Sequence, residues 1–209
     1  MKHLRVNYTK GELVEGNFTE NPFDLFTEWF EDAQSSESVK ESNAMVLSTV
    51  NGDAVDSRIV LLKDVRGNQF VFYTNYNSHK GQQIAQNSNC TLVFPWIGLE
   101  RQVIIRGKAS KNTLEESIDY FLSRPKSSQI GAWASTQSQK ISSRADLESQ
   151  LKFYEQKFDN KEVTKPEHWG GYEIDPLQIE FWQGRENRLH DRILFEKKGD
   201  KWSVTRLQP

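Results

Sequence analysis

The densest group of side chains that could do chemistry lies near the end of the chain. Residues 179–183 (IEFWQ) have the composition of a strand, and residues 188–192 (RLHDR) follow after a loop that contains a glycine. If the second segment is extended, Arg188, His190 and Arg192 lie on one face, because side chains alternate along a strand. Three such groups on one face repel one another unless something anionic lies between them. That partner is either a carboxylate of these same two segments or an anionic ligand.

Two further cations enclose an apolar run. Arg58 and Lys63 are separated by residues 59–62 (IVLL), which are typical of a buried strand. Alternation places the two cations on opposite faces of that strand. An unpaired charge within an apolar run is costly. Either Arg58 is paired with a carboxylate and Lys63 is solvated at the strand end, or each cation binds a separate anion.

A third segment combines a hydroxyl, a cation and a helix start. Residues 78–81 (SHKG) follow a predicted strand and open a short helix. The backbone N–H groups at a helix N-terminus, with Ser78 and Lys80 beside them, suit a phosphate group. Ordinary helix capping explains Ser78 equally well.

Tyr120 and Arg124 form a fourth candidate pair. They are four residues apart at the end of a predicted helix, so a hydroxyl and a guanidinium can converge on one anion. A tyrosine–arginine stacking pair on the helix surface is the alternative interpretation. Residues 131–138 (GAWASTQS) follow, and their small, hydroxyl and amide side chains would also suit a plain polar loop.

Short strands with helices around them must position these groups. Helices are predicted over residues 22–33, where Asn21 supplies the cap and Pro22 the first position, over 113–123 and over 143–158. Strands are predicted over residues 44–50, 54–62, 70–74, 90–95, 102–109, 172–174, 178–183, 192–196 and 202–206. This pattern predicts a mainly β fold, a closed or partly closed antiparallel barrel with peripheral helices. We expect an N-terminal arm over residues 1–20 and a single domain over residues 21–209.

The composition excludes several classes of protein. The chain has 209 residues, 36% of them hydrophobic and 11% aromatic, which is enough for one packed domain. Lys and Arg total 27 against 29 Asp and Glu, so neither nucleic acid nor an anionic membrane is an expected partner. No apolar run approaches the ~20 residues of a membrane span, and the first residues lack the apolar stretch of a signal peptide. The single cysteine, Cys90, excludes an internal disulfide and a cysteine-built metal site, so we expect a cytoplasmic protein without a metal.

Five motifs, in matching order and with sensible spacing, resemble the pyridoxine (pyridoxamine) 5′-phosphate oxidase family. They are residues 58–63 (RIVLLK), 100–102 (ERQ), 123–125 (SRP), 129–133 (QIGAW) and 179–192, the last of which resembles the family's C-terminal signature. The resemblance implies an antiparallel, FMN-binding split β-barrel of the Greek-key type, and a homodimer with FMN at the subunit interface. The implied reaction oxidises pyridoxine or pyridoxamine 5′-phosphate to pyridoxal 5′-phosphate while O2 is reduced to H2O2.

The resemblance also implies which residues hold each ligand. The residues expected to contact FMN are Arg58, Ile59, Val60, Leu61, Leu62, Lys63, Tyr73, Thr74, His79, Lys80, Gln102, Gln137, Ser138, Trp182 and Arg192. The residues expected to hold the substrate phosphate are Lys63, Tyr120, Arg124 and Ser128, with Arg188 and His190 as the catalytic candidates at the pyridine ring. Arg5 and Tyr8 match arm positions that can fold over the site in this family.

One position departs from the family pattern. Family members commonly carry arginine where this chain has His79, beside Lys80. Since histidine titrates near neutral pH, we expect FMN affinity to fall between about pH 6 and 8 as His79 loses its charge. The predicted placement of Arg58 and Lys63 on opposite faces agrees with this resemblance on independent grounds, because FMN and the substrate each carry one phosphate.

Two other functions remain open from the sequence. A split-barrel flavin oxidoreductase of another type would share Arg58 and the barrel pattern, but it gives no reason for Tyr120, Arg124, Arg188 and His190 together. A non-catalytic carrier of pyridoxal phosphate would need the phosphate cluster and no flavin site.

Overall fold

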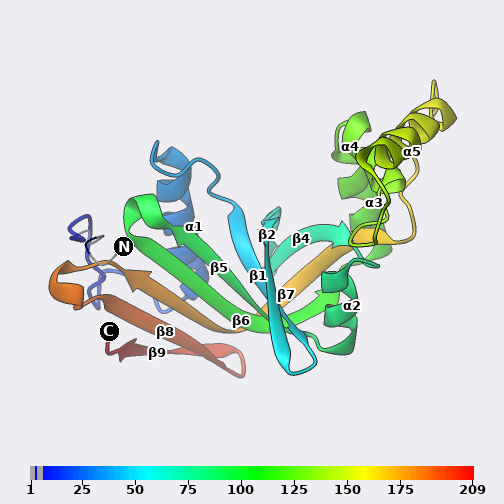
Figure 1. Ribbon diagram of the computed structural model, residues 1–209. Helices are drawn as coiled ribbons and strands as arrows, with labels where there is room; N and C mark the ends of the chain where they lie inside the picture. Colours follow the sequence, from blue (N-terminus) through cyan, green and yellow to red (C-terminus); the bar gives the residue numbers. More distant parts are fainter. Residues whose placement is uncertain (1–2, 4–6) are drawn as a thin grey trace.

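Within residue 3 and residues 7–209, which the computed structural model describes, nine strands form one antiparallel sheet (Figure 1). The main strand order is β2-β1-β5-β6-β7-β4-β3, and β8 and β9 extend from β7. The strands are β1 (Ala44–Asn51), β2 (Ala54–Leu61), β3 (Asp64–Arg66), β4 (Gln69–Asn75), β5 (Asn89–Trp96), β6 (Arg101–Lys111), β7 (Trp169–Gln183), β8 (Asp191–Lys198) and β9 (Lys201–Leu207). The sheet curls into a barrel that is not closed, which confirms the mainly β, split-barrel prediction.

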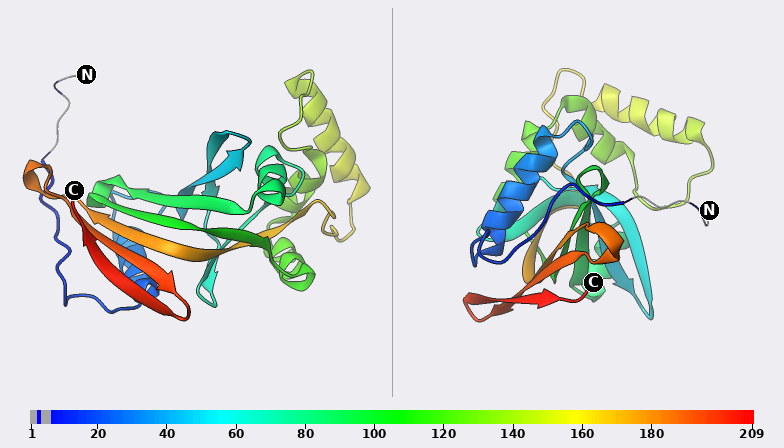
Figure 2. Two further views of the ribbon diagram at one scale, coloured as in Figure 1. Left: turned by 90° about the horizontal axis from the view of Figure 1, so that it is seen from below. Right: turned by 90° about the vertical axis from the view of Figure 1, so that its left-hand side faces the viewer.

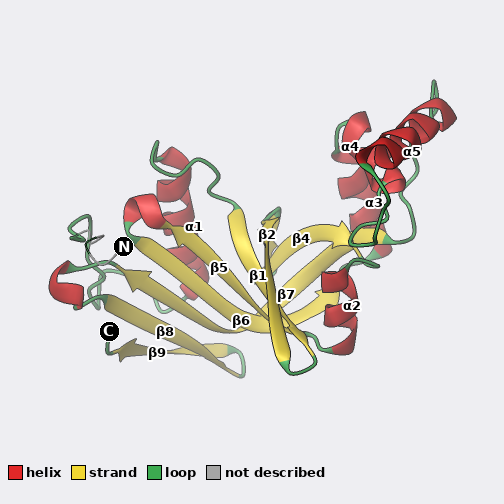
Figure 3. Ribbon diagram, viewed as in Figure 1, coloured by secondary structure: helices red, strands yellow, loops and turns green. Residues whose placement is uncertain are grey.

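Five α-helices and two 3-10 turns lie around the sheet, mostly at its ends (Figure 3). They are α1 (Pro22–Ser35), α2 (His79–Gln86), α3 (Leu114–Ser123), α4 (Lys126–Ala134), α5 (Arg144–Lys157), η1 (Ile97–Leu99) and η2 (Glu186–Arg188). None of the helices in the described part of the chain combines the length and the apolar character that crossing a bilayer requires.

The first helix and the first hairpin form where the sequence predicts them. The Asn21 side chain accepts a hydrogen bond from the Phe23 amide at 3.1 Å, and Pro22 occupies the first helical position. Phe26 then packs edge-on against Phe70 in the barrel core, with 4.9 Å between ring centroids. The β1–β2 turn uses Gly52 at φ +59°, a conformation that glycine adopts without a steric penalty.

β7 is a single long strand, so the prediction of two strands over 172–174 and 178–183 is wrong. Pro176 interrupts the pattern in the sequence, but the sheet accommodates it at a β-bulge where Gly107 of β6 pairs with Pro176 and Arg106 pairs with Gln178. A Cβ on Gly107 would lie 2.4 Å from the Asp175 carbonyl oxygen. Glycine at this position therefore lets the two backbones approach.

Helices α3, α4 and α5 form a helical lobe that projects from one end of the sheet (Figure 1). Thr113 and Glu116 form the capping box of α3, and Ser143 caps α5, so both predicted helices are confirmed. Helix α4 was not predicted, because no side-chain cap marks its start and its last residues belong to the stretch 131–138, for which a polar loop was one interpretation. Strand β3 was also missed, since three residues are too few to give a pattern.

Candidate functional site

A groove of about 930 Å³ lies where β2, β4 and α2 meet the helical lobe. Twelve residues that the sequence selected line it: Arg58, Ile59, Val60, Leu61, Lys63, Tyr73, Thr74, Lys80, Tyr120, Arg124, Ser128 and Gln137. The groove thus brings together most of the expected FMN contacts and the whole expected phosphate cluster.

Arg58 is held in the groove wall by neutral acceptors. Its Nη1 donates to the Leu47 carbonyl at 3.3 Å and to the Thr49 hydroxyl at 2.5 Å, and its Nη2 donates to Gln83 Oε1 at 3.3 Å. Burial lowers the pKa of Arg58, and the nearby Asp56 carboxylate opposes that shift. No described carboxylate forms an ion pair with Arg58, so its charge remains available to a ligand.

Lys80 is a second buried cation beside Arg58. It lies in the first turn of α2, whose cap is Ser78, as predicted. Its Nζ is 3.3 Å from Thr74 Oγ1 and 3.4 Å from Gln137 Oε1, both neutral groups that face the groove. Burial lowers the pKa of Lys80, and repulsion from Arg58 lowers it further. Two neighbouring cations with only neutral partners are expected to favour an anion.

Lys63 does not lie on the opposite side from Arg58. β2 ends at Leu61, so the alternation along that strand does not extend to Lys63, whose amide instead donates to the Val71 carbonyl at 2.8 Å. Both cations line the same groove. The prediction that they face opposite ways is therefore wrong, while the prediction that they bind separate anions is untested.

Aromatic rings form the floor below the expected phosphate cluster. Tyr73 and Tyr120 stack with 3.9 Å between centroids, and Trp169 continues the stack at 5.4 Å from Tyr73. The Arg124 guanidinium lies over Trp169, 4.7 Å from the ring centroid. Trp169 was not singled out in the sequence; its position at the start of β7, before Gly170, was the only signal available.

Arg124 does not share a helix face with Tyr120, because α3 ends at Ser123 and Arg124 is its extended C-cap. Both side chains nevertheless reach the groove. The Nη1 of Arg124 is buried and has no hydrogen-bond partner among the described residues. Burial also lowers the pKa of Arg124. A buried guanidinium nitrogen without a partner is expected to have one when a ligand is bound.

Six other expected residues lie at the opposite end of the sheet: Tyr8, Gln102, Trp182, Arg188, His190 and Arg192. In Figures 1 and 2 the orange turn between β7 and β8 is at one end and the helical lobe is at the other. Gln102, Trp182 and Arg192 occupy one row across β6, β7 and β8. Arg192 binds the buried Glu180 carboxylate, with Nη2 at 2.7 Å, so a neighbouring carboxylate does neutralise this cation.

The sequence argument required Arg188 and His190 to lie on an extended segment, and they do not. Arg188 ends the turn η2 with φ +62°, after Asn187 at φ +55°, and β8 begins at Asp191. Arg188 is exposed and forms no ion pair within the described residues. His190 lies 4.6 Å from Trp182 between ring centroids. The two side chains are therefore close in the chain but are not presented by one strand face.

Of the remaining four expected residues, the three that the structure describes lie neither in the groove nor among the six at the opposite end of the sheet. Leu62 is buried in the core beside the groove, His79 is exposed at the first position of α2, and Ser138 is exposed with φ +72°. Arg5 lies outside the described residues. The pH effect assigned to His79 stays a prediction.

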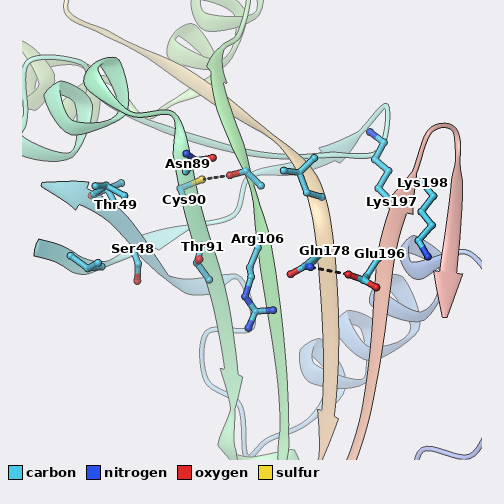
Figure 4. A pocket seen from close by; sticks show the side chains of 14 residues that line it. Ser48, Thr49, Asn89, Cys90, Thr91, Arg106, Gln178, Glu196, Lys197 and Lys198 are labelled. Carbon is cyan, nitrogen blue, oxygen red and sulfur yellow. Dashed lines mark hydrogen bonds between the residues drawn. The ribbon is translucent and has the colours of Figure 1, made fainter. Parts of the chain in front are cut away.

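A separate hollow of about 500 Å³ lies on the outer face of the sheet (Figure 4). A row of polar residues crosses it, in which Ser48 pairs with Thr91, Thr91 with Arg106, Arg106 with Gln178, and Gln178 with Glu196. Among the expected site residues that the structure describes, none lines this hollow.

Comparison with known protein families assigns both parts of the chain. Residues 32–156 match the family described as pyridoxamine 5′-phosphate oxidase. Residues 169–209, which span β7 to β9, match the pyridoxine 5′-phosphate oxidase C-terminal dimerisation region.

Curated relatives match the full length of the chain. A pyridoxine/pyridoxamine 5′-phosphate oxidase from Christiangramia forsetii is 47% identical over 100% of this chain and 98% of its own length. A second, pyridoxine/pyridoxamine 5′-phosphate oxidase 2 from Hydrogenovibrio crunogenus, is 51% identical over 99% and 97% of the two chains.

Solved structures share the fold at lower identity. PhzG from Burkholderia lata, solved with tetrahydrophenazine-1-carboxylic acid, superposes with a TM-score of 0.88 at 23% identity, covering 96% of this chain and 100% of that one. A pyridoxamine 5′-phosphate oxidase-related, FMN-binding protein from Nostoc punctiforme gives a TM-score of 0.71 at 14% identity over 92% and 100% of the two chains.

Proposed function

The chain belongs to the pyridoxamine 5′-phosphate oxidase family, and from that premise we infer that it is an FMN-dependent oxidase of pyridoxine or pyridoxamine 5′-phosphate. The product is pyridoxal 5′-phosphate, and O2 is reduced to H2O2. One observation carries the assignment of the groove. Arg58, Lys63, Lys80 and Arg124 all line it, and none of them has a carboxylate partner in the part of the chain that the structure describes.

Two anionic ligands, each with a phosphate, would explain why four cations without a carboxylate partner among the described residues line one groove. Lys80 lies beside Thr74 and Gln137, and Arg58 donates to Gln83. This end suits FMN because both cations are at least partly buried and hydrogen-bonded to neutral groups. FMN supplies the chemistry of the reaction, which is acceptance of a hydride from C4′ of the substrate. No protein nucleophile is needed, so the task of the chain is to bind and orient.

The substrate phosphate is assigned to Lys63, Tyr120, Arg124 and Ser128. The unpartnered Nη1 of Arg124 supports this choice, since a phosphate oxygen would supply its missing acceptor. The guanidinium also lies over the Trp169 ring, at 4.7 Å from its centroid, which favours this position of the charge. The phosphate takes no part in the reaction, so binding it orients the substrate without altering the reacting carbon.

His190 is assigned to the pyridine ring as a neutral hydrogen-bond donor. Its Nδ1 accepts from the Arg185 amide at 3.1 Å, so the proton of the neutral ring is on Nε2. Burial lowers the pKa of His190, the neighbouring Arg188 lowers it further, and Asp191 opposes both. The net shift favours the uncharged imidazole, and Arg188 supplies the positive charge at the ring.

The complete site needs two copies of the chain. The groove with Arg124 and the turn with Arg188 are at opposite ends of one sheet, so one chain cannot bring both to one substrate (Figure 2). The outer sheet face between them carries half-exposed apolar residues such as Val46, Val93 and Ile104, which a second copy would cover. A homodimer that combines the groove of one subunit with the turn of its partner follows from this arrangement.

Complementation between subunits tests the two-copy site. Heterodimers of an Arg124→Ala chain and an Arg188→Ala chain, purified through two different tags, should contain one intact site and regain about half of the wild-type activity. The matched control pairs an Arg124→Ala/Arg188→Ala chain with a wild-type chain. It should be nearly inactive, because each site then lacks one arginine. Half activity in the control and none in the first heterodimer would place both residues in one subunit's site.

The activity itself is tested by flavin binding and peroxide release. FMN titrated into the protein should lose fluorescence at micromolar concentrations, and the complex should release H2O2 when pyridoxamine 5′-phosphate is added. Flavin binding without peroxide would favour another flavin oxidoreductase. Tight binding of pyridoxal phosphate without flavin binding would favour a non-catalytic carrier.

A further inference from the structure

The N-terminal arm is fixed to the end of the sheet through its backbone. The Leu13 amide donates to Asp191 Oδ2 at 3.0 Å, and the Leu13 side chain is buried in the main core. Arg206 binds the Leu13 carbonyl at 2.7 Å and pairs with Glu15. The arm, blue in Figure 1, thus lies beside the orange turn that carries Arg188.

Glu100 is a second anchor, closer to the start of the arm. One of its carboxylate oxygens, Oε2, accepts from the Thr9 amide at 2.8 Å and from the Lys10 amide at 3.0 Å. The residue is 8% exposed and adopts φ +56°, which is uncommon for a residue other than glycine. Its own carbonyl accepts from the Gly184 amide at 2.7 Å, so the anchor is tied to the end of β7. No cation pairs with this buried carboxylate among the described residues, and two arm amides are its side-chain partners.

The anchor determines where Tyr8 lies. The Tyr8 ring meets Trp182 edge-on at 5.8 Å and His190 at 5.6 Å between centroids. A Cβ on Gly184 would come within 2.8 Å of Tyr8 Cγ and 3.1 Å of Glu100 Cβ, so the absence of a side chain there makes room for both. Tyr8 is one residue before the first anchored amide, which leaves it little freedom to move away.

We propose that Glu100 is a positioning residue, which holds Tyr8 against Trp182 and His190 so that an arm side chain forms one wall of the substrate site. This inference rests on the proposed function, which puts His190 at the pyridine ring. Because Glu100 accepts from amide groups, it holds the backbone of residues 9 and 10 directly. The Lys10 side chain adds a separate contact, in which its Nζ donates to the Gly98 carbonyl at 2.6 Å. Glu100 touches neither substrate nor cofactor and acts through Tyr8.

A double-mutant cycle between Glu100 and Tyr8 tests the proposal. Glu100→Ala should lower kcat/KM by about 10-fold, comparable to losing one charge-assisted hydrogen bond, while the FMN dissociation constant stays unchanged. Tyr8→Ala should have a similar effect. In the Tyr8→Ala background, Glu100→Ala should cost little more, because both changes remove the same wall. Additive losses would show that Glu100 acts independently of Tyr8 and would overturn the proposal.

Three further variants separate positioning from loss of fold. Glu100→Gln keeps an acceptor oxygen for both amides and should retain most of the activity. Thr9→Pro removes one donor from the arm and leaves the barrel untouched, so it should reproduce part of the Glu100→Ala loss. Glu12→Ala breaks only the exposed ion pair with Arg185 on the same arm and should match the wild type. Equal activity for Glu100→Ala and Glu12→Ala would contradict the inference.

Limited proteolysis tests whether Glu100 holds the arm, without the need for an enzyme assay. Trypsin cleavage after Lys10, followed by mass spectrometry, should be faster in Glu100→Ala than in the wild type or in Glu12→Ala. Unchanged cleavage would overturn the anchor. If Glu100→Ala is cleaved faster than the wild type, but the wild type releases no peroxide, the anchor stands and only the proposed function is overturned.

Discussion

Replacing Arg188 with alanine should slow flavin reduction by roughly 100-fold at saturating substrate, because a misplaced pyridine ring spoils the alignment that hydride transfer requires. FMN should remain bound, because Arg58 and Lys80, the cations assigned to its phosphate, lie in the groove and are unchanged by this substitution. The measurement is stopped-flow absorbance of the flavin under anaerobic single-turnover conditions. His190→Ala should act in the same direction but more mildly, because it removes a smaller contact.

The surroundings of Arg188 sharpen this test. Arg188 is exposed and unpaired within the described residues, so its loss should leave the free energy of unfolding nearly unchanged. Arg185→Ala is the matched control: it removes an arginine from the same turn that pairs with Glu12 and Asp191. Arg185→Ala should reduce flavin at nearly the wild-type rate. A folded, flavin-saturated Arg188→Ala protein that also reduces at the wild-type rate would refute the role of Arg188.

Arg124→Ala should weaken substrate binding by roughly 10- to 100-fold, the equivalent of one charge-assisted hydrogen bond of about 1.5–3 kcal/mol. The reason is the buried Nη1, which has no acceptor among the described residues until a phosphate supplies one. FMN affinity should barely change, because Lys80 and Arg58 are assigned to the other phosphate. Titration calorimetry with pyridoxal phosphate and with FMN measures the two affinities separately.

Lys126→Ala provides the control for Arg124. Lys126 is also a cation after α3, but it is exposed and its Nζ donates to the Lys161 carbonyl outside the groove. Its removal should change neither affinity. Equal losses of substrate and FMN affinity in Arg124→Ala would show that the groove is not divided between two phosphates.

Local signals predicted most of the fold. The cap at Asn21, the cap at Ser143 and the glycine in the β1–β2 turn each act within a few residues, so they can be read directly from the sequence. The continuity of β7 through Pro176 could not be read, because it depends on a bulge against Gly107, which is distant in sequence. Tertiary pairing decided that element.

For the candidate site, too, some features could be predicted from the sequence and others could not. Residue types and order sufficed to select the cations of the groove, and the structure brings Arg58, Lys63, Lys80 and Arg124 together. Their geometry was predicted less well. The face of Lys63 depends on where β2 ends, and the conformation of Arg188 depends on a left-handed turn, neither of which alternation along a strand can describe.

β7 begins at Trp169, beneath Arg124, and ends one residue after Trp182, beside His190. At roughly 3.3 Å per residue, these thirteen steps span up to about 43 Å. One continuous strand therefore sets the distance between the groove and the turn, to which we assign the two parts of the site. In a dimer of the proposed kind, the two β7 strands, one from each subunit, would hold the two reaction centres at a fixed separation. Adding or removing one residue in β7 would change that separation and reverse the faces of every side chain beyond it.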